Sequence, residues 1–355
     1  MIFWTCVRRL VLILISLSLA PVGPLRGAEQ PPALPAPVSN NAVAAVKING
    51  QVLVYSLMGL GSEKSWKSVT NDANALNLKF DRWTSIRPVP GSGRLGAAAA
   101  AVREQILLMG GFVPDQSGRQ AIVSDLTIYD PVGLRWYRGP DLLVPVRDAV
   151  AGVYRDRYVY VMGGFADNGP TKELQVYDTE AQHWFEATPI PGTGVFGHAG
   201  SVVGDSIVFV DGAKKNAAGG TIAYVPSDEC WLGKIERRDP KKIQWKQLPA
   251  HPGTARYRIA AGGSEREQKI YFAGGSQTVY DYTGIDLEGK PAEPSPTIFA
   301  FDLKSNSWDL IEENVPNATM DHRGLVVTSG GLLLVGGMAK GPVVVPTVEL
   351  LPKKR

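Results

Sequence analysis

Short apolar runs alternate with turn-forming residues along most of this chain, and one window recurs five times. Each window places a Trp six residues after an Asp or Asn, at Trp83, Trp136, Trp184, Trp245 and Trp308. Successive Trp residues lie 53, 48, 61 and 63 residues apart. A period of this size predicts modules that are stacked or arranged radially.

An apolar run that ends in paired glycine precedes most of these Trp residues. The runs are Leu107–Gly111, Tyr160–Gly164, Tyr271–Gly275 and Leu334–Gly337, with the degenerate versions Met58–Gly61 and Val210–Gly212. Because the runs have strand periodicity and are bounded by Gly, Pro, Asn and Asp, each module is predicted to be a small antiparallel sheet.

The paired glycines and the Asp-to-Trp spacing recur together and in order over residues 40 to 350. In this respect the chain resembles the Kelch repeat family, which implies an all-β fold of radial blades. The same arrangement follows from packing, because one small sheet cannot bury both of its faces and a closed ring of sheets can. The innermost strands are expected where the sequence turns small, at 96–101, 149–153, 199–203 and 259–263.

The number of modules predicts a six-bladed β-propeller over residues 29–355. The sixth module has strand runs near 324–328, 332–337 and 348–351, and it ends without a Trp strand. Residues 30–38 resemble the segment that follows the Trp strand elsewhere, as at 248–252. We therefore expect an N-terminal strand to close the last blade.

Residues 1–28 are predicted to be a signal peptide. Arg8 and Arg9 precede an apolar stretch at 10–20 that is short for a membrane span and is followed by Pro-rich sequence. The pattern favours export to the periplasm or secretion, with cleavage between Ala20 and Ala28 and no transmembrane span afterwards. An uncleaved anchor is the alternative.

Charge and cysteine content exclude several classes of function. The chain has 37 basic and 34 acidic residues, and three of the basic residues but no acidic residue lie in 1–28. The remaining chain is therefore balanced, and without a basic cluster it is not predicted to bind nucleic acid. Cys230 is the only cysteine outside 1–28, so cleavage leaves no pair for an intrachain disulfide.

Cationic groups are expected at one mouth of the central channel. They precede the small-residue strands of five modules and are Arg94, Arg147, His198, Arg258 and Arg323. Arginine presents a planar fork suited to a carboxylate or phosphate. Converging forks repel one another, so an anionic ligand or a set of internal acids is expected between them; alternatively, each Arg is a structural clasp.

The long loop after the fifth glycine pair is a second candidate for ligand binding, because long loops on rigid scaffolds often carry binding groups. Tyr280 and Tyr282 in this loop are predicted to stack on a sugar ring. A loop that only packs over the rim, or that docks a protein partner, is the alternative.

Within the Kelch class, the six blades, the export signal and the exchange of a terminal strand resemble the N-acetylneuraminate epimerase (sialic acid mutarotase) group. This resemblance implies a small anionic carbohydrate as ligand, held by arginines, and anomer interconversion by an acid-base group without a cofactor or metal. It also implies a catalytic Glu directly after the glycine that ends the second strand of the fourth blade, where this chain has Ala213. Asp211, Lys214 and Glu229 are the candidates to replace it.

Two main functions therefore stay open from the sequence. One is an isomerase of the mutarotase type, and the other is a non-catalytic propeller that binds a carbohydrate or a protein. Copper-dependent galactose oxidation, which also occurs on Kelch propellers, would need two Tyr and two His ligands. The four His residues lack a spacing that would bring two of them together.

Overall fold

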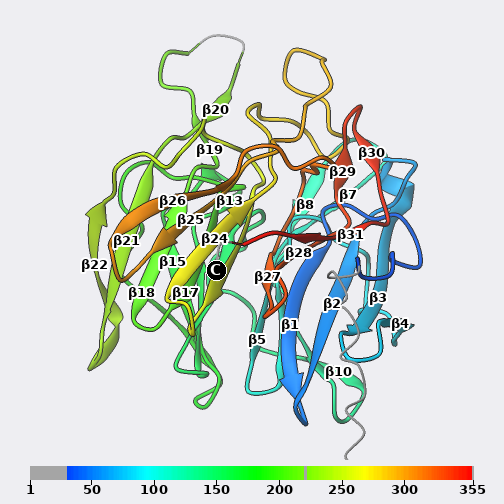
Figure 1. Ribbon diagram of the computed structural model, residues 1–355, viewed down its shortest axis with the longest axis horizontal. Helices are drawn as coiled ribbons and strands as arrows, with labels where there is room; N and C mark the ends of the chain where they lie inside the picture. The colour runs from blue at the N-terminus through cyan, green and yellow to red at the C-terminus, as the bar shows by residue number, and fades with distance from the viewer. Residues whose placement is uncertain (1–29, 220–221, 354–355) are drawn as a thin grey trace, which may run out of the picture.

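Six antiparallel sheets surround a central axis in the computed structural model, which describes residues 30–219 and 222–353 (Figure 1). The predicted signal peptide lies outside the described residues. The prediction of a six-bladed β-propeller is confirmed. No helix in the described ranges has the length and apolarity to span a membrane.

Five blades have four strands each, numbered from the axis outward, and the sixth has three. The strands of blades I to III are β1 (Ala42–Ile48), β2 (Gln51–Leu60), β3 (Val69–Asn77) and β4 (Arg82–Ser85); β5 (Ala98–Val102), β6 (Gln105–Met109), β9 (Leu126–Asp130) and β10 (Arg135–Arg138); and β11 (Val150–Tyr154), β12 (Tyr158–Met162), β15 (Leu174–Asp178) and β16 (His183–Glu186). Those of blades IV to VI are β17 (Ala199–Val203), β18 (Ser206–Val210), β21 (Cys230–Glu236) and β22 (Asp239–Gln247); β23 (Ala260–Ser264), β24 (Lys269–Ala273), β25 (Ile298–Asp302) and β26 (Ser307–Glu312); and β27 (Val326–Val327), β28 (Leu332–Val335) and β31 (Val348–Leu351). The predicted small-residue strands are innermost.

The two ends of the channel differ. On the loop face, the connections between second and third strands carry a 3-10 turn, η1 (Trp66–Ser68), and the short hairpins β7 (Phe112–Pro114) with β8 (Gln120–Ile122), β13 (Phe165–Ala166) with β14 (Gly169–Pro170), β19 (Ala213–Lys215) with β20 (Tyr224–Pro226), and β29 (Met338–Ala339) with β30 (Val343–Val344). The hairpin face, opposite, carries the turns between first and second strands. In Figure 1 the loop face is at the top.

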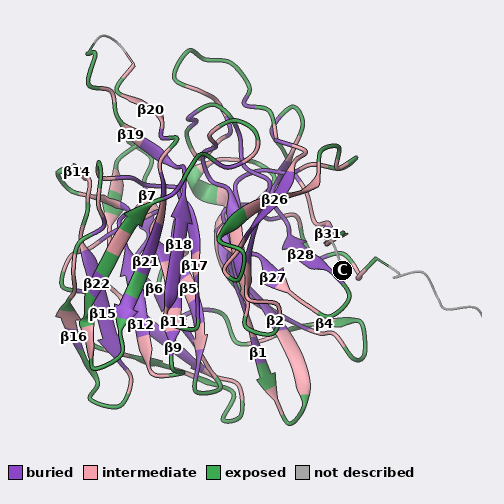
Figure 2. Ribbon diagram, turned by 60° about the vertical axis from the view of Figure 1, so that its left-hand side comes forward, coloured by how far each residue is buried: buried purple, intermediate pink, exposed green. Residues whose placement is uncertain are grey.

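The core consists of layers between neighbouring blades (Figure 2). The window that identified the modules has a direct role in this packing. The indole nitrogens of Trp136, Trp184 and Trp308 donate hydrogen bonds of 2.8 to 2.9 Å to carbonyl oxygens of the preceding blade. The repeated Trp therefore joins each of these blades to its neighbour.

Residues 30–38 close blade VI, as predicted, but they do not form the expected strand. Trp83 of blade I donates to the carbonyl of Pro32 at 2.9 Å, which places Pro32 where the other blades have the end of their fourth strand. Leu34 N donates to Pro346 O, and the Gln30 side chain bonds both main-chain groups of Leu350. The segment makes no regular ladder, because its prolines lack N–H donors.

Blade IV allows a direct test of the Trp hydrogen bond, because the indole nitrogen of Trp245 is buried and has no partner. We expect Trp184→Phe to lower the free energy of unfolding by about 1 kcal/mol more than Trp245→Phe, since only the first loses a hydrogen bond. Urea denaturation of both variants measures this difference. Equal losses would show that the indole bond contributes nothing to the joint between blades.

Candidate functional site

A closed belt of inter-blade hydrogen bonds surrounds the axis at the loop-face end of the channel. One residue per blade forms it, each with φ between 53° and 69°: Asn40, Gly96, Asp148, Gly197, Arg258 and Asp321. Each is linked to the next by a bond of 2.5 to 3.3 Å, through main-chain groups except for the Asn40 side chain, and His322 N makes the link to Arg258 O. The belt brings residues far apart in the chain together at the axis.

A hydrophobic cap lies on the loop-face side of this belt. In every blade, the residue before the belt residue forms a bridge with the residue that follows the glycine pair: Ser39 with Leu60, Leu95 with Phe112, Arg147 with Phe165, Phe196 with Ala213, Tyr257 with Ser276, and Met320 with Met338. Most of these side chains are buried together in one cluster with Tyr280. The cap and belt close the mouth at which the ligand was expected.

The five predicted cationic residues do not share one level of the axis. Arg94 lies two positions before its belt residue and Arg147 one position before, whereas His198 follows its belt residue by one position and Arg323 by two. Only Arg258 is a belt residue. Positions counted along the sequence do not correspond between blades, because the turns between first and second strands differ in length. These turns range from two residues, at 103–104, to four, at 265–268.

Arg94 is a structural clasp within blade II. Its guanidinium donates to Gly110 O at 3.0 Å and to Thr127 Oγ1, and it is buried and does not line the cavity in the channel. The residue in the same position of blade V is Arg256, which donates to Gly274 O and Thr297 O. Sequence reasoning missed Arg256 because Arg258 was placed in its position.

Three of the predicted arginines do converge, on two buried carboxylates. Asp148 contacts Arg147 at 2.6 Å, Arg323 at 2.5 Å and Arg258 at 3.6 Å. Asp321 contacts Arg258 at 3.0 Å and Arg323 at 3.6 Å. These five residues are called the axial cluster below. Internal acids therefore lie between the arginines, which is one of the two arrangements expected from the sequence.

Sequence reasoning did not name Asp148 or Asp321, although each lies within two residues of a predicted arginine. Burial alone would raise the pKa of Asp148, but Arg323, Arg258 and Arg147 outweigh this effect and hold that pKa well below its usual range. The carboxyl group of Asp148 is therefore ionised at neutral pH.

The axial cluster keeps an excess of one positive charge, since three arginines face two carboxylates. Its hydrogen bonding is also incomplete: Arg258 Nε and Arg323 Nε are buried without a hydrogen-bond partner, as is Asp321 Oδ2. Arg147 lies over the rings of Phe112, Phe165 and Phe196, and its side chain is 13% exposed. The side chains of Arg258 and Arg323 are almost fully buried.

The two histidines near the axial cluster are neutral at pH 7. Burial lowers the pKa of His198 to about 4 and that of His322 to about 4. His322 Nε2 lies 2.9 Å from Thr319 Oγ1, and His198 packs edge-on against Phe209. Neither histidine adds charge to the site.

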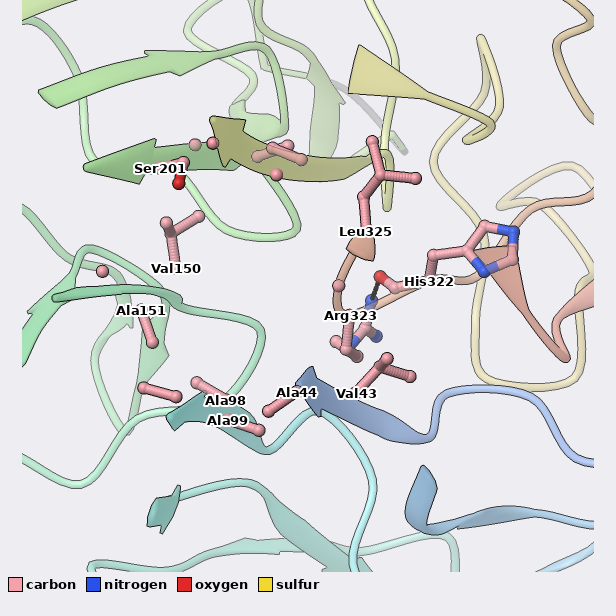
Figure 3. A pocket seen from close by; sticks show the side chains of 18 of the residues that line it. Val43, Ala44, Ala98, Ala99, Val150, Ala151, Ser201, His322, Arg323 and Leu325 are labelled. Carbon is pink, nitrogen blue, oxygen red and sulfur yellow. Dashed lines mark hydrogen bonds between the residues drawn. The ribbon is translucent and has the colours of Figure 1, made fainter. Parts of the chain in front are cut away.

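A cavity of about 340 Å³ occupies the channel on the other side of the belt. Small residues of the six first strands line most of it, including Ala44, Ala99, Ala151 and Ser201 (Figure 3). Asp148, His198, His322 and Arg323 line the end next to the belt. The cavity is thus uncharged along its walls and charged at one end.

The side chains of the three candidates for a catalytic group have different partners. Asp211 is fully buried between blades, where its carboxyl group contacts His251 Nε2 at 2.8 Å and Arg256 N at 3.1 Å. Burial raises its pKa, and the neighbouring His251 and Arg256 oppose that rise. None of Asp211, Lys214 and Glu229 lines the cavity.

Lys214 and Glu229 are engaged elsewhere on the loop face. Lys214 lies on the β19–β20 hairpin, and its Nζ is 3.5 Å from Asp228 Oδ1. Glu229 accepts hydrogen bonds of 3.0 Å from Thr193 Oγ1 and Trp231 Nε1. Ala213 is fully buried in the cap.

The two tyrosines of the long loop have different positions. Tyr280 is buried in the cap against Tyr257, so it cannot stack on a ligand in this arrangement. Tyr282 is partly exposed beside Phe112. Among the described residues, no group of three or more His, Cys, Asp or Glu gathers as a metal site, and burial raises the pKa of the Cys230 thiol to about 12.

Comparisons with known proteins agree with this architecture. Residues 93–143 and 147–191 match the Kelch motif. An N-acetylneuraminate epimerase of Haemophilus influenzae is 25% identical over 233 residues, which are 56% of this chain and 58% of that protein. A putative F-box/kelch-repeat protein of Arabidopsis thaliana is 31% identical over 104 residues, or 29% of this chain and 26% of that protein.

The fold also matches a solved structure. The structure of YjhT superposes with a TM-score of 0.70 at 19% identity, covering 89% of this chain and 95% of that one. The chain spans little more than half the length of the epimerase it matches. This protein is a six-bladed β-propeller with Kelch motifs that resembles the N-acetylneuraminate epimerases.

Proposed function

We propose that this protein is an exported, non-catalytic propeller that binds a small anionic sugar. The observation that carries the proposal is the axial cluster, in which three arginines and two carboxylates leave one positive charge in excess next to the channel cavity. A buried charge without a counter-charge is costly. A single ligand carboxylate would supply the missing counter-charge.

The absence of turnover is proposed on the position of Ala213. Similarity to the epimerases implies a Glu at this position, and the buried Ala213 has no acid-base group. Asp211, the nearest substitute in sequence, is already bonded to His251 and Arg256. General acid-base catalysis needs a group within hydrogen-bond reach of the ligand, and none of the three candidates lines the cavity.

Nuclear magnetic resonance can test binding and turnover in one sample. We expect saturation transfer from the protein to N-acetylneuraminate, and at least tenfold weaker binding of the neutral sugar N-acetylmannosamine. Freshly dissolved N-acetylneuraminate should reach anomeric equilibrium at the same rate with and without protein. Binding of neither sugar, or of both equally, would overturn the anionic-sugar proposal, and faster equilibration would overturn the claim that the propeller is non-catalytic.

A further inference from the structure

The wall of the channel is rich in hydrogen-bonding groups although its side chains are small. Each first strand, from β1 to β27, pairs with a second strand on one side only. Its other edge faces the axis, where successive main-chain N–H and C=O groups have no strand partner. The wall therefore offers donors and acceptors without charge, which suits a ligand with several hydroxyl groups.

The cavity is closed at one end and open to solvent at the other. The belt and cap occupy the loop-face end. The cap residues Leu95, Phe196, Tyr257 and Met320 do not line the cavity. At the opposite end the lining reaches the last or second-to-last residue of five first strands, at Ala101, Val153, Val202, Gly263 and Val327. Ala101 and Val153 there are partly exposed.

Arg323 is the only arginine or lysine among the described residues that line the cavity. Both carboxylate oxygens of Asp148 are engaged, Oδ2 by Arg147 and Oδ1 by Arg323. The Arg323 side chain is 4% exposed, its Nε has no hydrogen-bond partner, and it lies at the cavity next to Val43 and Leu325 (Figure 3). His198 and His322 are neutral. The end of the cavity thus suits one negative charge.

We infer that the ligand enters the channel from the hairpin face and binds with its carboxylate toward Arg323 and its hydroxyl groups along the strand edges. This inference rests on the proposed function and specifies where on the propeller the ligand binds. A cavity of about 340 Å³ lies within the range of small-molecule sites. The loop face, where long loops suggested a site, would then have no part in binding this ligand.

A charge placed at the hairpin-face end of the channel tests this location. Ala101→Glu should weaken binding of N-acetylneuraminate about tenfold and Ala101→Lys should strengthen it by a similar factor, because the two side chains have similar bulk and opposite charge. Raising the salt concentration should reduce both effects. Isothermal titration calorimetry on the full chain measures the affinities.

A matched pair on the loop face serves as control. Val343 lies in the β29–β30 hairpin and is 55% exposed. Val343→Glu and Val343→Lys should leave the affinity within twofold of wild type. If the Val343 pair changes the affinity and the Ala101 pair does not, the ligand binds at the loop face and this inference is wrong while the proposed function stands. If the wild type binds no N-acetylneuraminate, the proposed function fails first.

Discussion

Asp148→Asn is expected to destabilise the protein by about 3 to 5 kcal/mol, the usual cost of removing one partner from a buried ion pair. Asp148 is fully buried and faces three guanidinium groups. The amide would keep the shape of the carboxyl group and remove its charge, leaving Asp321 alone against three arginines. Urea denaturation followed by Trp fluorescence at pH 7 measures the loss.

A matched control tests whether the loss of stability depends on the burial of the carboxylate and not only on the removal of a negative charge. Asp228→Asn removes an acid whose side chain is 83% exposed and lies 3.5 Å from Lys214. Its effect should stay within about 0.5 kcal/mol. The double variant Asp148→Asn, Arg147→Met should lose less than the two single variants together, because the residues interact directly. Additive losses would show that Asp148 and Arg147 do not interact energetically.

The stability difference between wild type and Asp148→Asn should also depend on pH. Because the pKa of Asp148 is lowered in the folded protein, its contribution is fully present above the unfolded value of about 4. The contribution is then lost progressively as the pH falls from about 4 toward the lower folded value. The difference should therefore be constant between pH 5 and 8 and should shrink below pH 4.

The repeated features of the chain were predictable because they follow from local chemistry. The Trp and Gly spacing predicted the number of blades, and even the degenerate glycine positions were identified correctly. Met58 and Asp211 have φ values of 55° and 65°, which are close to those of Gly110 and Gly163 in the same position of other blades. The fold tolerates a side chain there at the cost of a left-handed conformation.

The register at the axis was not predictable in the same way. Belt positions are left-handed in all six blades, yet Gly occupies only two of them, and Asn, Asp and Arg occupy the others. With turns of different length next to them, sequence offsets could not align Arg94 with Arg256 or reveal Asp321. The convergence of the axial cluster depends on distances between blades, which no local pattern encodes.

Gly197→Ala should lower the free energy of unfolding by about 3 kcal/mol or more. Gly197 has a φ of 61°, and a Cβ atom there would lie 2.3 Å from Cε2 of the Tyr257 ring. Tyr257 is buried in the cap, and Gly197 itself donates to Asp148 O and accepts from Arg258 N in the belt. Neither the Tyr257 ring nor the main chain at Gly197 can move without losing these contacts. The cost of overpacking therefore adds to that of the left-handed conformation.

Gly204→Ala isolates the conformational part of this cost. Gly204 has nearly the same φ, 60°, but no atom lies within 4 Å of an added Cβ. Its loss should be about 1 kcal/mol. Urea denaturation of the two variants therefore gives the cost of the clash as a difference. Similar losses at both positions would mean that Tyr257 moves freely, and a cap that moves freely would no longer close the channel at the loop face.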